Sequence, residues 1–248
     1  MLIIGLNPVL ETLDFAPDKL QKIYIMDGVS GSKVTKIIEI AGKKSIKVER
    51  HSKADFEKII DKKDKSEGIS QGVIAIAEDF NYYDFDELIR SLADKKDALI
   101  VVLDEIQDPH NLGAIIRTAA AVGADGVVIS EKNSAKVTHT FVKSSAGATN
   151  YIKICLKNNI YNAIKSLQIS NFFVLGTSLK AKQSHFDLEL TGRFGVVFGS
   201  EGRGLRTNIS NLCDELVKIP VAGKIESLNV SVSAGVILYE ILRQRKNI

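Results

Sequence analysis

An asparagine, a glycine and an arginine stand at helical spacing in the segment DPHNLGAIIRTAAAVG, residues 108–123. The Asp-Pro pair that opens it indicates a turn, and Asn111 is well placed to cap the helix that follows. Gly113 has no capping role and costs about 1 kcal/mol relative to alanine inside a helix. Because helical side chains lie back over the preceding turn, a missing side chain at Gly113 leaves room for Arg117 to reach the helix start. The pattern indicates a cation at a ligand site, and the alternative is a plain capping asparagine with a solvated arginine.

A second candidate is the apolar run FGVVFGSEGRGL, which leads straight into Gly199, Gly202 and Gly204. Glycines at the end of a strand allow the backbone to approach a ligand closely. The spacing is GxxGxG rather than the GxGxxG of dinucleotide-binding proteins, so a nicotinamide-dependent oxidoreductase is poorly supported. Glu201 lies between the glycines and is either a site residue or an ordinary surface glutamate.

The third candidate is IPVAGKIESLNVSVSAGVILYE, residues 219–240. Its alternating apolar residues are typical of a strand, but residues 228–245 are too long a run for one, since strands rarely exceed ~10 residues. We therefore expect a helix capped by Ser227, with Asn229 in the first turn, where its amide can face a ligand. The serines, alanine and glycine of residues 231–235 would let another helix pack closely.

Several kinds of active site are poorly supported by the sequence. The four histidines show no metal-ligand spacing, and there is no GxSxG nucleophile motif. Cys155 and Cys213 are far apart and have no plausible base beside them, so we expect structural thiols in a reducing compartment. The sequence predicts neither a metal site nor a covalent hydrolase.

The composition is that of a globular protein of 248 residues, 45% of them apolar. A net charge of +3 permits an anionic partner without demanding one. The basic-leaning block of residues 33–65 is either a solvated surface or a surface that faces RNA. No apolar run approaches the ~20 residues that span a bilayer, and the N-terminus does not resemble a signal peptide. We therefore expect a cytoplasmic protein with no membrane partner.

The elements that must position these residues fall into two series. Strands alternating with helices predict a small α/β module over residues 1–77, followed by a linker and the start of the next domain over residues 78–97. From residue 98 to 248, near-continuous apolar strands separated by helices predict a mostly parallel sheet covered on both faces. The expected strands are 98–104, 126–130, 151–155, 172–178, 193–200 and 215–220, with helices at 111–123, 135–147, 159–168 and the C-terminus. Ligands of such sheets bind beyond the carboxyl ends of the strands, where all three clusters lie.

Together the three clusters resemble the motifs of the SpoU, or TrmH-like, branch of the SPOUT RNA methyltransferases. The motif NxGAxxR is complete from Asn111 to Arg117, GxEGxG from Gly199 to Gly204, and IPxxGxxxSLNVS from Ile219 to Ser231. The stretches GLNPVLETL and QGVIA also resemble the small ribosomal-protein-like, RNA-binding substrate domain of a subgroup that methylates a guanosine ribose in 23S rRNA. Ser70 stands where many relatives have a histidine, so no role for that histidine is carried over.

This resemblance implies a C-terminal trefoil knot that holds S-adenosylmethionine, and a homodimer formed by the knotted domain and the final helix. It implies cofactor contacts at Gly176, Thr177, Gly199, Ile219 and Leu228. The implied reaction is methylation of an RNA ribose 2′-hydroxyl, with large-subunit rRNA as the expected substrate and a tRNA methyltransferase or a non-catalytic RNA-binding protein as alternatives. The resemblance gives Arg117 the catalytic role. Because guanidinium is nearly always charged, we expect Arg117 to stabilise a developing alkoxide, oriented with the ribose by Asn111, Glu201 and Asn229.

Overall fold

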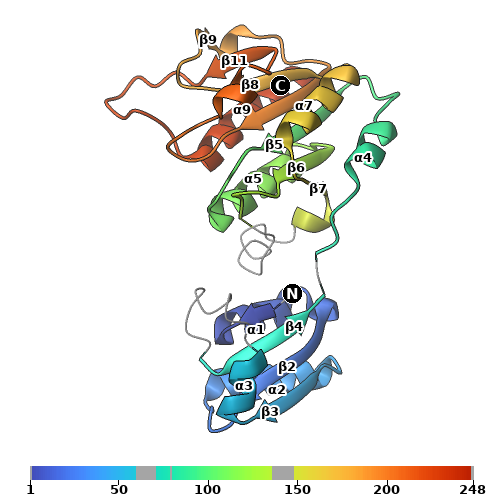
Figure 1. Ribbon diagram of the computed structural model, residues 1–248, viewed down its shortest axis with the longest axis vertical. Helices are drawn as coiled ribbons and strands as arrows, with labels where there is room; N and C mark the ends of the chain where they lie inside the picture. Colours follow the sequence, from blue (N-terminus) through green and yellow to red (C-terminus); the bar gives the residue numbers. More distant parts are fainter. Residues whose placement is uncertain (1, 60–70, 79, 136–147, 247–248) are drawn as a thin grey trace. The chain divides into compact units, whose positions relative to one another are not determined.

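The structure, a computed structural model, describes residues 2–59, 71–78, 80–135 and 148–246. The chain divides into two compact units, an N-terminal unit that ends at Asn81 and a C-terminal unit that begins at Tyr82 (Figure 1). Ser70 and the helix expected over residues 135–147 lie outside the described residues, except for Ala135. In the part of the chain that the structure describes, no helix has the length and apolarity needed to cross a membrane.

The N-terminal unit is built on a four-stranded sheet of order β1-β4-β2-β3. The central strand β4 runs antiparallel to β1 and β2, whereas β2 and β3 are parallel. Its strands are β1 (Leu2–Ile4), β2 (Leu20–Met26), β3 (Lys47–His51) and β4 (Val73–Ala77), and its α-helices are α1 (Leu6–Phe15), α2 (Ser32–Lys43) and α3 (Lys53–Ile59).

Alternation along β2 explains how this unit builds its core. Ile23 and Ile25 are fully buried, while Lys22 and Tyr24 between and beside them stay partly exposed on the opposite face. Helix α2 buries residues three and four positions apart, namely Val34, Ile37 and Ala41, and contributes them to the same apolar cluster. Each fully buried aliphatic side chain of this kind stabilises the fold by about 1.5–3 kcal/mol.

The C-terminal unit contains a seven-stranded sheet of order β7-β6-β5-β10-β8-β11-β9. Every pairing in it is parallel. Its strands are β5 (Ala98–Leu103), β6 (Gly126–Ser130), β7 (Lys153–Lys157), β8 (Phe173–Thr177), β9 (Gln183–Ser184), β10 (Arg193–Phe198) and β11 (Glu215–Lys218), and its α-helices are α4 (Phe85–Ser91), α5 (Pro109–Ala121), α7 (Ile160–Ile169), α8 (Thr207–Ser210) and α9 (Val230–Lys246).

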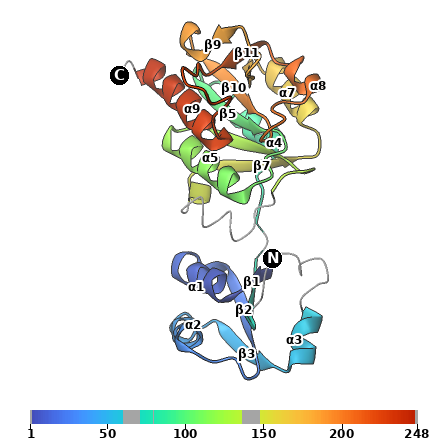
Figure 2. The same ribbon diagram turned by 90° about the vertical axis from the view of Figure 1, so that its left-hand side faces the viewer.

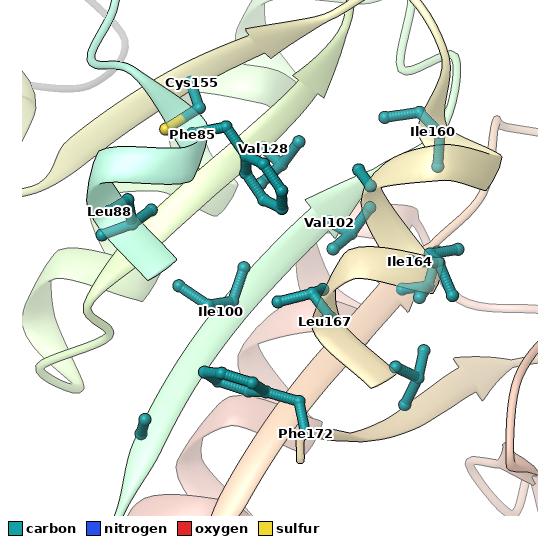
Figure 3. Close-up of a cluster of buried hydrophobic side chains, with 14 of the residues drawn as sticks. Phe85, Leu88, Ile100, Val102, Val128, Cys155, Ile160, Ile164, Leu167 and Phe172 are labelled. Carbon is teal, nitrogen blue, oxygen red and sulfur yellow. The ribbon is translucent and has the colours of Figure 1, made fainter. Parts of the chain in front are cut away.

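Helices cover both faces of this sheet. On one face, Phe85 of α4 and Leu167 of α7 pack over Ile100 and Val128 of the sheet (Figure 3). On the other face α5 packs along α9 (Figure 2). The α/β architecture with a parallel sheet and a smaller N-terminal unit is therefore confirmed, while the trefoil knot stays a prediction.

The connection between the units is fixed to the sheet of the C-terminal unit. Tyr83 donates its backbone N–H to the carbonyl of Ile154 in the edge strand β7 at 2.8 Å. The ammonium of Lys153 lies 4.6 Å from the centre of the Tyr83 ring. Residues 78–97, expected as a linker and the start of the next domain, thus contain helix α4 (Phe85–Ser91), which belongs to the C-terminal unit.

Candidate functional site

A cavity of about 780 Å³ opens at the carboxyl ends of β8, β10 and β11. Its lining comes mainly from residues 177–180, 198–205, 217–219 and 227–230. The strand order changes direction beside β5, where β6 follows on one side and β10 lies on the other. Parallel sheets bind ligands beyond the carboxyl ends of their strands and at such switch points, and β10, whose end borders the cavity, is the strand next to β5.

The first motif is linked to this cavity through Asn111, which lies buried in the first turn of α5 and donates a hydrogen bond to the cavity residue Glu201. The sequence-based expectation that Asn111 caps the helix was wrong. Asp108 is the N-cap, and its Oδ1 accepts a hydrogen bond from the backbone N–H of His110 at 2.8 Å. The Asn111 amide is thereby free to donate to Glu201 and, at 3.3 Å, to the other Asp108 oxygen.

The second motif forms a closed loop over residues 199–204. The N–H of Gly204 donates to the carbonyl of Ser200 at 2.9 Å. A Cβ at Gly199 would lie 2.2 Å from the Gly204 carbonyl carbon, so only glycine allows this approach. Gly202 and Gly204 have φ of 80° and 67°, a region that disfavours other residues. The loop geometry carries Glu201 to Asn111, ninety positions away in the chain.

The third motif begins helix α9 at Val230, and its N-cap position is held by Asn229. Asn229 Oδ1 accepts from the backbone N–H of Ser231 at 2.8 Å and from its hydroxyl at 2.6 Å. The expectation that Ser227 caps the helix was therefore wrong. Asn229 also lines the cavity, and its amide nitrogen has no recorded hydrogen bond to a described residue.

Arg117 lies on α5, exposed and away from the lining of the cavity in its own chain. Its guanidinium forms no ion pair or hydrogen bond with any of the residues that the structure describes. Glu201 and Asn229 therefore line one cavity, and Asn111 is joined to it through its hydrogen bond to Glu201. Arg117 is absent from the cavity lining, and its guanidinium has no ion-pair partner among the described residues.

The five residues expected to contact the cofactor are placed differently from one another. Thr177, Gly199, Ile219 and Leu228 line the cavity. Gly176 does not, because a Cβ there would meet side-chain atoms of Leu216 and Cys213 at 2.6 and 2.7 Å. Close packing behind the cavity accounts for that glycine.

Two charged residues of this region escaped the sequence reasoning. Asp104, directly after β5, is 1% exposed, and both of its carboxylate oxygens accept hydrogen bonds from Arg206, Nε at 3.0 Å from Oδ2. The hydrogen bond to Asp104 raises the pKa of the Arg206 guanidinium above its usual value. Two features of the sequence could have indicated this pair. Asp104 directly follows a fully apolar strand, and Arg206 closely follows the glycine-containing loop of the second motif.

Neither metal nor thiol chemistry finds support in the geometry. Among the described residues no group of three or more histidine, cysteine, aspartate or glutamate side chains could hold a metal ion. Burial raises the pKa of both the Cys155 and Cys213 thiols to about 12, so both are protonated near neutrality. Their role is packing, as the sequence predicted.

Comparison with known proteins supports one family for both units. A family model described as "SpoU rRNA Methylase family" matches residues 98–239. A second family model, described as "RNA 2'-O ribose methyltransferase substrate binding", matches residues 2–83. The chain is 33% identical to YacO of Bacillus subtilis (strain 168), named for the TrmH family of tRNA/rRNA methyltransferases, over 98% of this chain and 95% of YacO. A protein named for the same family from Staphylococcus aureus (strain COL) is also 33% identical, over 99% of this chain and 97% of its own.

A solved structure shows the same fold. The SpoU methyltransferase AviRb from Streptomyces viridochromogenes, crystallised with its cofactor AdoMet, superimposes with a TM-score of 0.67 at 23% identity, covering all of this chain and 91% of AviRb. The strand-end cavity, the contact between its second motif and the first, and the family matches agree, and the chain belongs to the SpoU family of RNA 2′-O-ribose methyltransferases.

Proposed function

We propose that the cavity of the C-terminal unit transfers a methyl group from S-adenosylmethionine to the ribose 2′-hydroxyl of a guanosine in large-subunit rRNA. The observation that carries this proposal is that the second and third motifs line one cavity, and the first motif is joined to it by the hydrogen bond from Asn111 to Glu201. The alternative substrate is a tRNA ribose, since the relatives are named for both RNA classes.

The cavity fits a nucleoside cofactor. Its volume of about 780 Å³ lies within the ~300–1,000 Å³ of typical small-molecule sites. Ile219 and Leu228 offer apolar surface suited to an adenine, and the backbone near Thr177 and Gly199 at the strand ends offers hydrogen-bonding groups. The lining also includes Lys180, Arg203 and Lys218, which suit a carboxylate. When bound, the cofactor supplies an activated methyl group on a sulfonium.

The protein must orient the ribose and stabilise the oxygen that loses its proton. Glu201 is the only carboxylate in the described lining of the cavity, and Asn111 fixes the direction in which it points. Asn229 is held by Ser231, so its amide nitrogen keeps a defined direction and can donate to a ribose or phosphate oxygen. These contacts would hold the hydroxyl in a reactive position, which is worth several kcal/mol of barrier.

Arg117 supplies the cation of the proposed mechanism. A guanidinium stays charged at any working pH, so its role is to stabilise the developing alkoxide and to bind an RNA phosphate. Its exposure and its lack of a partner among the described residues suit a group that meets RNA rather than its own chain. Because Arg117 is absent from the cavity lining of its own chain, the proposed site is completed by bound RNA or by a second subunit.

We further propose a homodimer formed through helix α9. Val232 and Tyr239 are 50% and 54% exposed, and with Gly235 and Val236 they follow the spacing i, i+3, i+4, i+7 of one helix face. A Cβ added at Gly235 would meet nothing within 4 Å, so another helix could approach there. An exposed apolar stripe of this kind is typical of a protein–protein contact.

The N-terminal unit is proposed to bind the RNA, and the C-terminal unit to carry out the transfer, in the cytoplasm. This division is supported by the family descriptions that match the two units. Only RNA offers a 2′-hydroxyl, so a ribose methyltransferase of this type cannot use DNA.

The decisive experiment maps ribose methylation in total RNA from cells with and without this protein. We expect one 2′-O-methylated guanosine in large-subunit rRNA to disappear with the protein. If a tRNA ribose methyl group disappears instead, the substrate is tRNA rather than large-subunit rRNA. Titration calorimetry with S-adenosylmethionine tests the cofactor separately, and no binding would indicate a non-catalytic RNA-binding protein.

A further inference from the structure

We propose that Asp104 and Arg206 are positioning residues that clamp the loop of residues 199–205 so that Glu201 meets Asn111. This inference rests on the proposed function, because it assigns residues that act through Glu201. Neither residue touches the cavity, since both are absent from its lining.

Asp104 holds both ends of this loop. Its backbone N–H donates to the carbonyl of Phe198, the last residue before the loop, at 2.9 Å. Its carboxylate accepts two hydrogen bonds from Arg206, the first residue after the loop. One residue at the end of β5 therefore fixes the point where the loop leaves the sheet and the point where it returns.

The environment of this ion pair makes it directional. The Asp104 side chain is fully buried, whereas that of Arg206 is 43% exposed. A two-pronged arginine–carboxylate contact fixes orientation as well as distance, which a lysine cannot do. Because the carboxylate is buried, it has few other ways to satisfy its charge, so the arginine is held to this one position.

Glu105 strengthens the clamp from the neighbouring position. Its carboxylate lies 3.4 Å from a third nitrogen of Arg206, and it also accepts from Asn133 at 3.2 Å. The residue adopts φ of 61°, a left-handed conformation that costs energy for a glutamate. Its N–H donates to the hydroxyl of Ser130 at 3.0 Å, which fixes the backbone of β5 to that of β6 at this point.

The loop is thus joined to the β5–α5 segment at two points. Glu201 bonds to Asn111 at the tip, and Arg206 bonds to Asp104 at the base. The loop itself is closed by the hydrogen bond from the Gly204 N–H to the Ser200 carbonyl, which couples its tip to its base. Loosening the base should displace the tip, and a displacement of 1 Å at a reacting group can cost about 10²-fold in rate.

The test compares Arg206→Gln and Arg206→Lys with a matched control, Lys95→Gln. Lys95 also pairs with a partly buried aspartate, Asp125, and its side chain is 47% exposed, but the pair lies at the opposite end of the strands. We expect Arg206→Gln to lower kcat about tenfold or more while leaving the KM for RNA within about twofold. Arg206→Lys should fall between wild type and Arg206→Gln, and the control should match wild type.

Hydrogen exchange of the backbone amides of residues 199–205 gives a readout that does not depend on activity. We expect faster exchange of these amides in both Arg206 variants and no change in the control. If Arg206→Gln does not fold, the double variant Asp104→Asn with Arg206→Gln removes the buried charge and serves in its place. If the wild-type protein transfers no methyl group to RNA, the proposed function is wrong. The hydrogen-exchange comparison would still show whether the Asp104–Arg206 pair holds residues 199–205 in place.

Two outcomes would overturn the inference. The first is unchanged loop exchange with a raised KM for RNA, which would make Arg206 an RNA contact. The second is additivity of Arg206→Gln and Glu201→Gln in their effects on kcat, since residues that act through one another are not additive. We expect the second substitution to add little to the first.

Discussion

The sheets of the two units carry their charged side chains in different ways. In the N-terminal unit, Glu49 on β3 accepts contacts from Lys22, Lys47 and His51 along a partly exposed sheet face. In the C-terminal unit, both faces of the sheet are apolar, and a buried carboxylate, Asp104, lies at a strand end. A partly exposed ion network contributes little and tolerates change, whereas a buried pair fixes geometry. The contrast is in keeping with the proposed division, in which the strand ends of the C-terminal unit carry out the transfer and the surface of the N-terminal unit binds RNA.

The largest effect on kcat is expected from Arg117→Ala, a substitution in the C-terminal unit. The variant should fold and bind S-adenosylmethionine like wild type, because the Arg117 side chain is exposed, forms no ion pair or hydrogen bond with a described residue and does not line the cavity. Loss of a group that stabilises the transition state lowers kcat about 10²–10³-fold. Calorimetry and radiolabelled methyl transfer to RNA measure the two effects, and near-normal turnover would show that the cation of the site is another residue.

A mixing experiment tests whether Arg117 acts in the site of a second subunit. Arg117→Ala and Asn229→Ala each inactivate the protein if both residues are needed. Arg117 stands apart from the cavity of its own chain, whereas Asn229 lines it. If the dimer joins them, mixed and reassembled subunits should recover part of the activity. No recovery in proven heterodimers would mean that each chain uses its own arginine.

A smaller effect is expected from changing the acceptor at Glu201. Glu201→Ala leaves the buried amide of Asn111 without this partner and should lower kcat about 10²-fold through misplacement. Glu201→Gln keeps an acceptor oxygen, although neutral hydrogen bonds are about half as strong as charged ones, so a loss of about tenfold is expected. Steady-state kinetics of both variants give the comparison, and equal losses would indicate that the charge rather than the hydrogen bond matters.

Changes in the N-terminal unit should alter RNA affinity and leave kcat unchanged. Lys43 and Lys44 at the end of α2 are exposed and form no ion pair with a described residue. Replacing both by alanine should weaken RNA binding and reduce the slope of log affinity against log salt by about one per lost phosphate contact. Lys58→Ala is the control, because Lys58 is paired with Asp55 at 2.9 Å. Equal slopes for wild type and the double variant would place the RNA elsewhere on this unit.

Most of the fold of the C-terminal unit could be predicted, because buried parallel strands are near-continuous apolar runs. Strand β6 was expected at residues 126–130 and is found there. Strand β10 was expected to reach residue 200 but ends at Phe198, since Gly199 already approaches Gly204. The two-residue strand β9 and the three-residue β1 were missed, because so few residues show no periodicity.

Six of the nine residues expected at the site line the cavity, and their role in the reaction stays a prediction. The local contacts of the region could not be predicted. Asn111 and Ser227 were expected to cap helices, yet Asp108 and Asn229 do so. Each region offers two residues with good capping side chains, and residue type does not rank them. A contact with Glu201, far along the chain, decides how Asn111 is used. The same limit hid the Asp104–Arg206 pair, whose members are about a hundred positions apart.

The smallest expected effect is a difference in pH dependence between one glutamate of each unit. The pKa of Glu49 is lowered to about 2, mainly by its hydrogen bond from Lys47, and that of Glu240 to about 2, mainly by its hydrogen bond from Arg243. A lowered pKa stabilises the folded state above the unfolded-state value of about 4.3, and this stabilisation is lost as pH falls toward 2. The gap in Tm between wild type and Glu240→Gln, measured by circular dichroism, should therefore close between pH 5 and pH 2. The Glu240 side chain is 9% exposed and that of Glu49 is 26% exposed. Added salt should therefore reduce the Tm difference between wild type and Glu49→Gln more than the Tm difference between wild type and Glu240→Gln. Equal salt sensitivity would remove the distinction between the two ion networks.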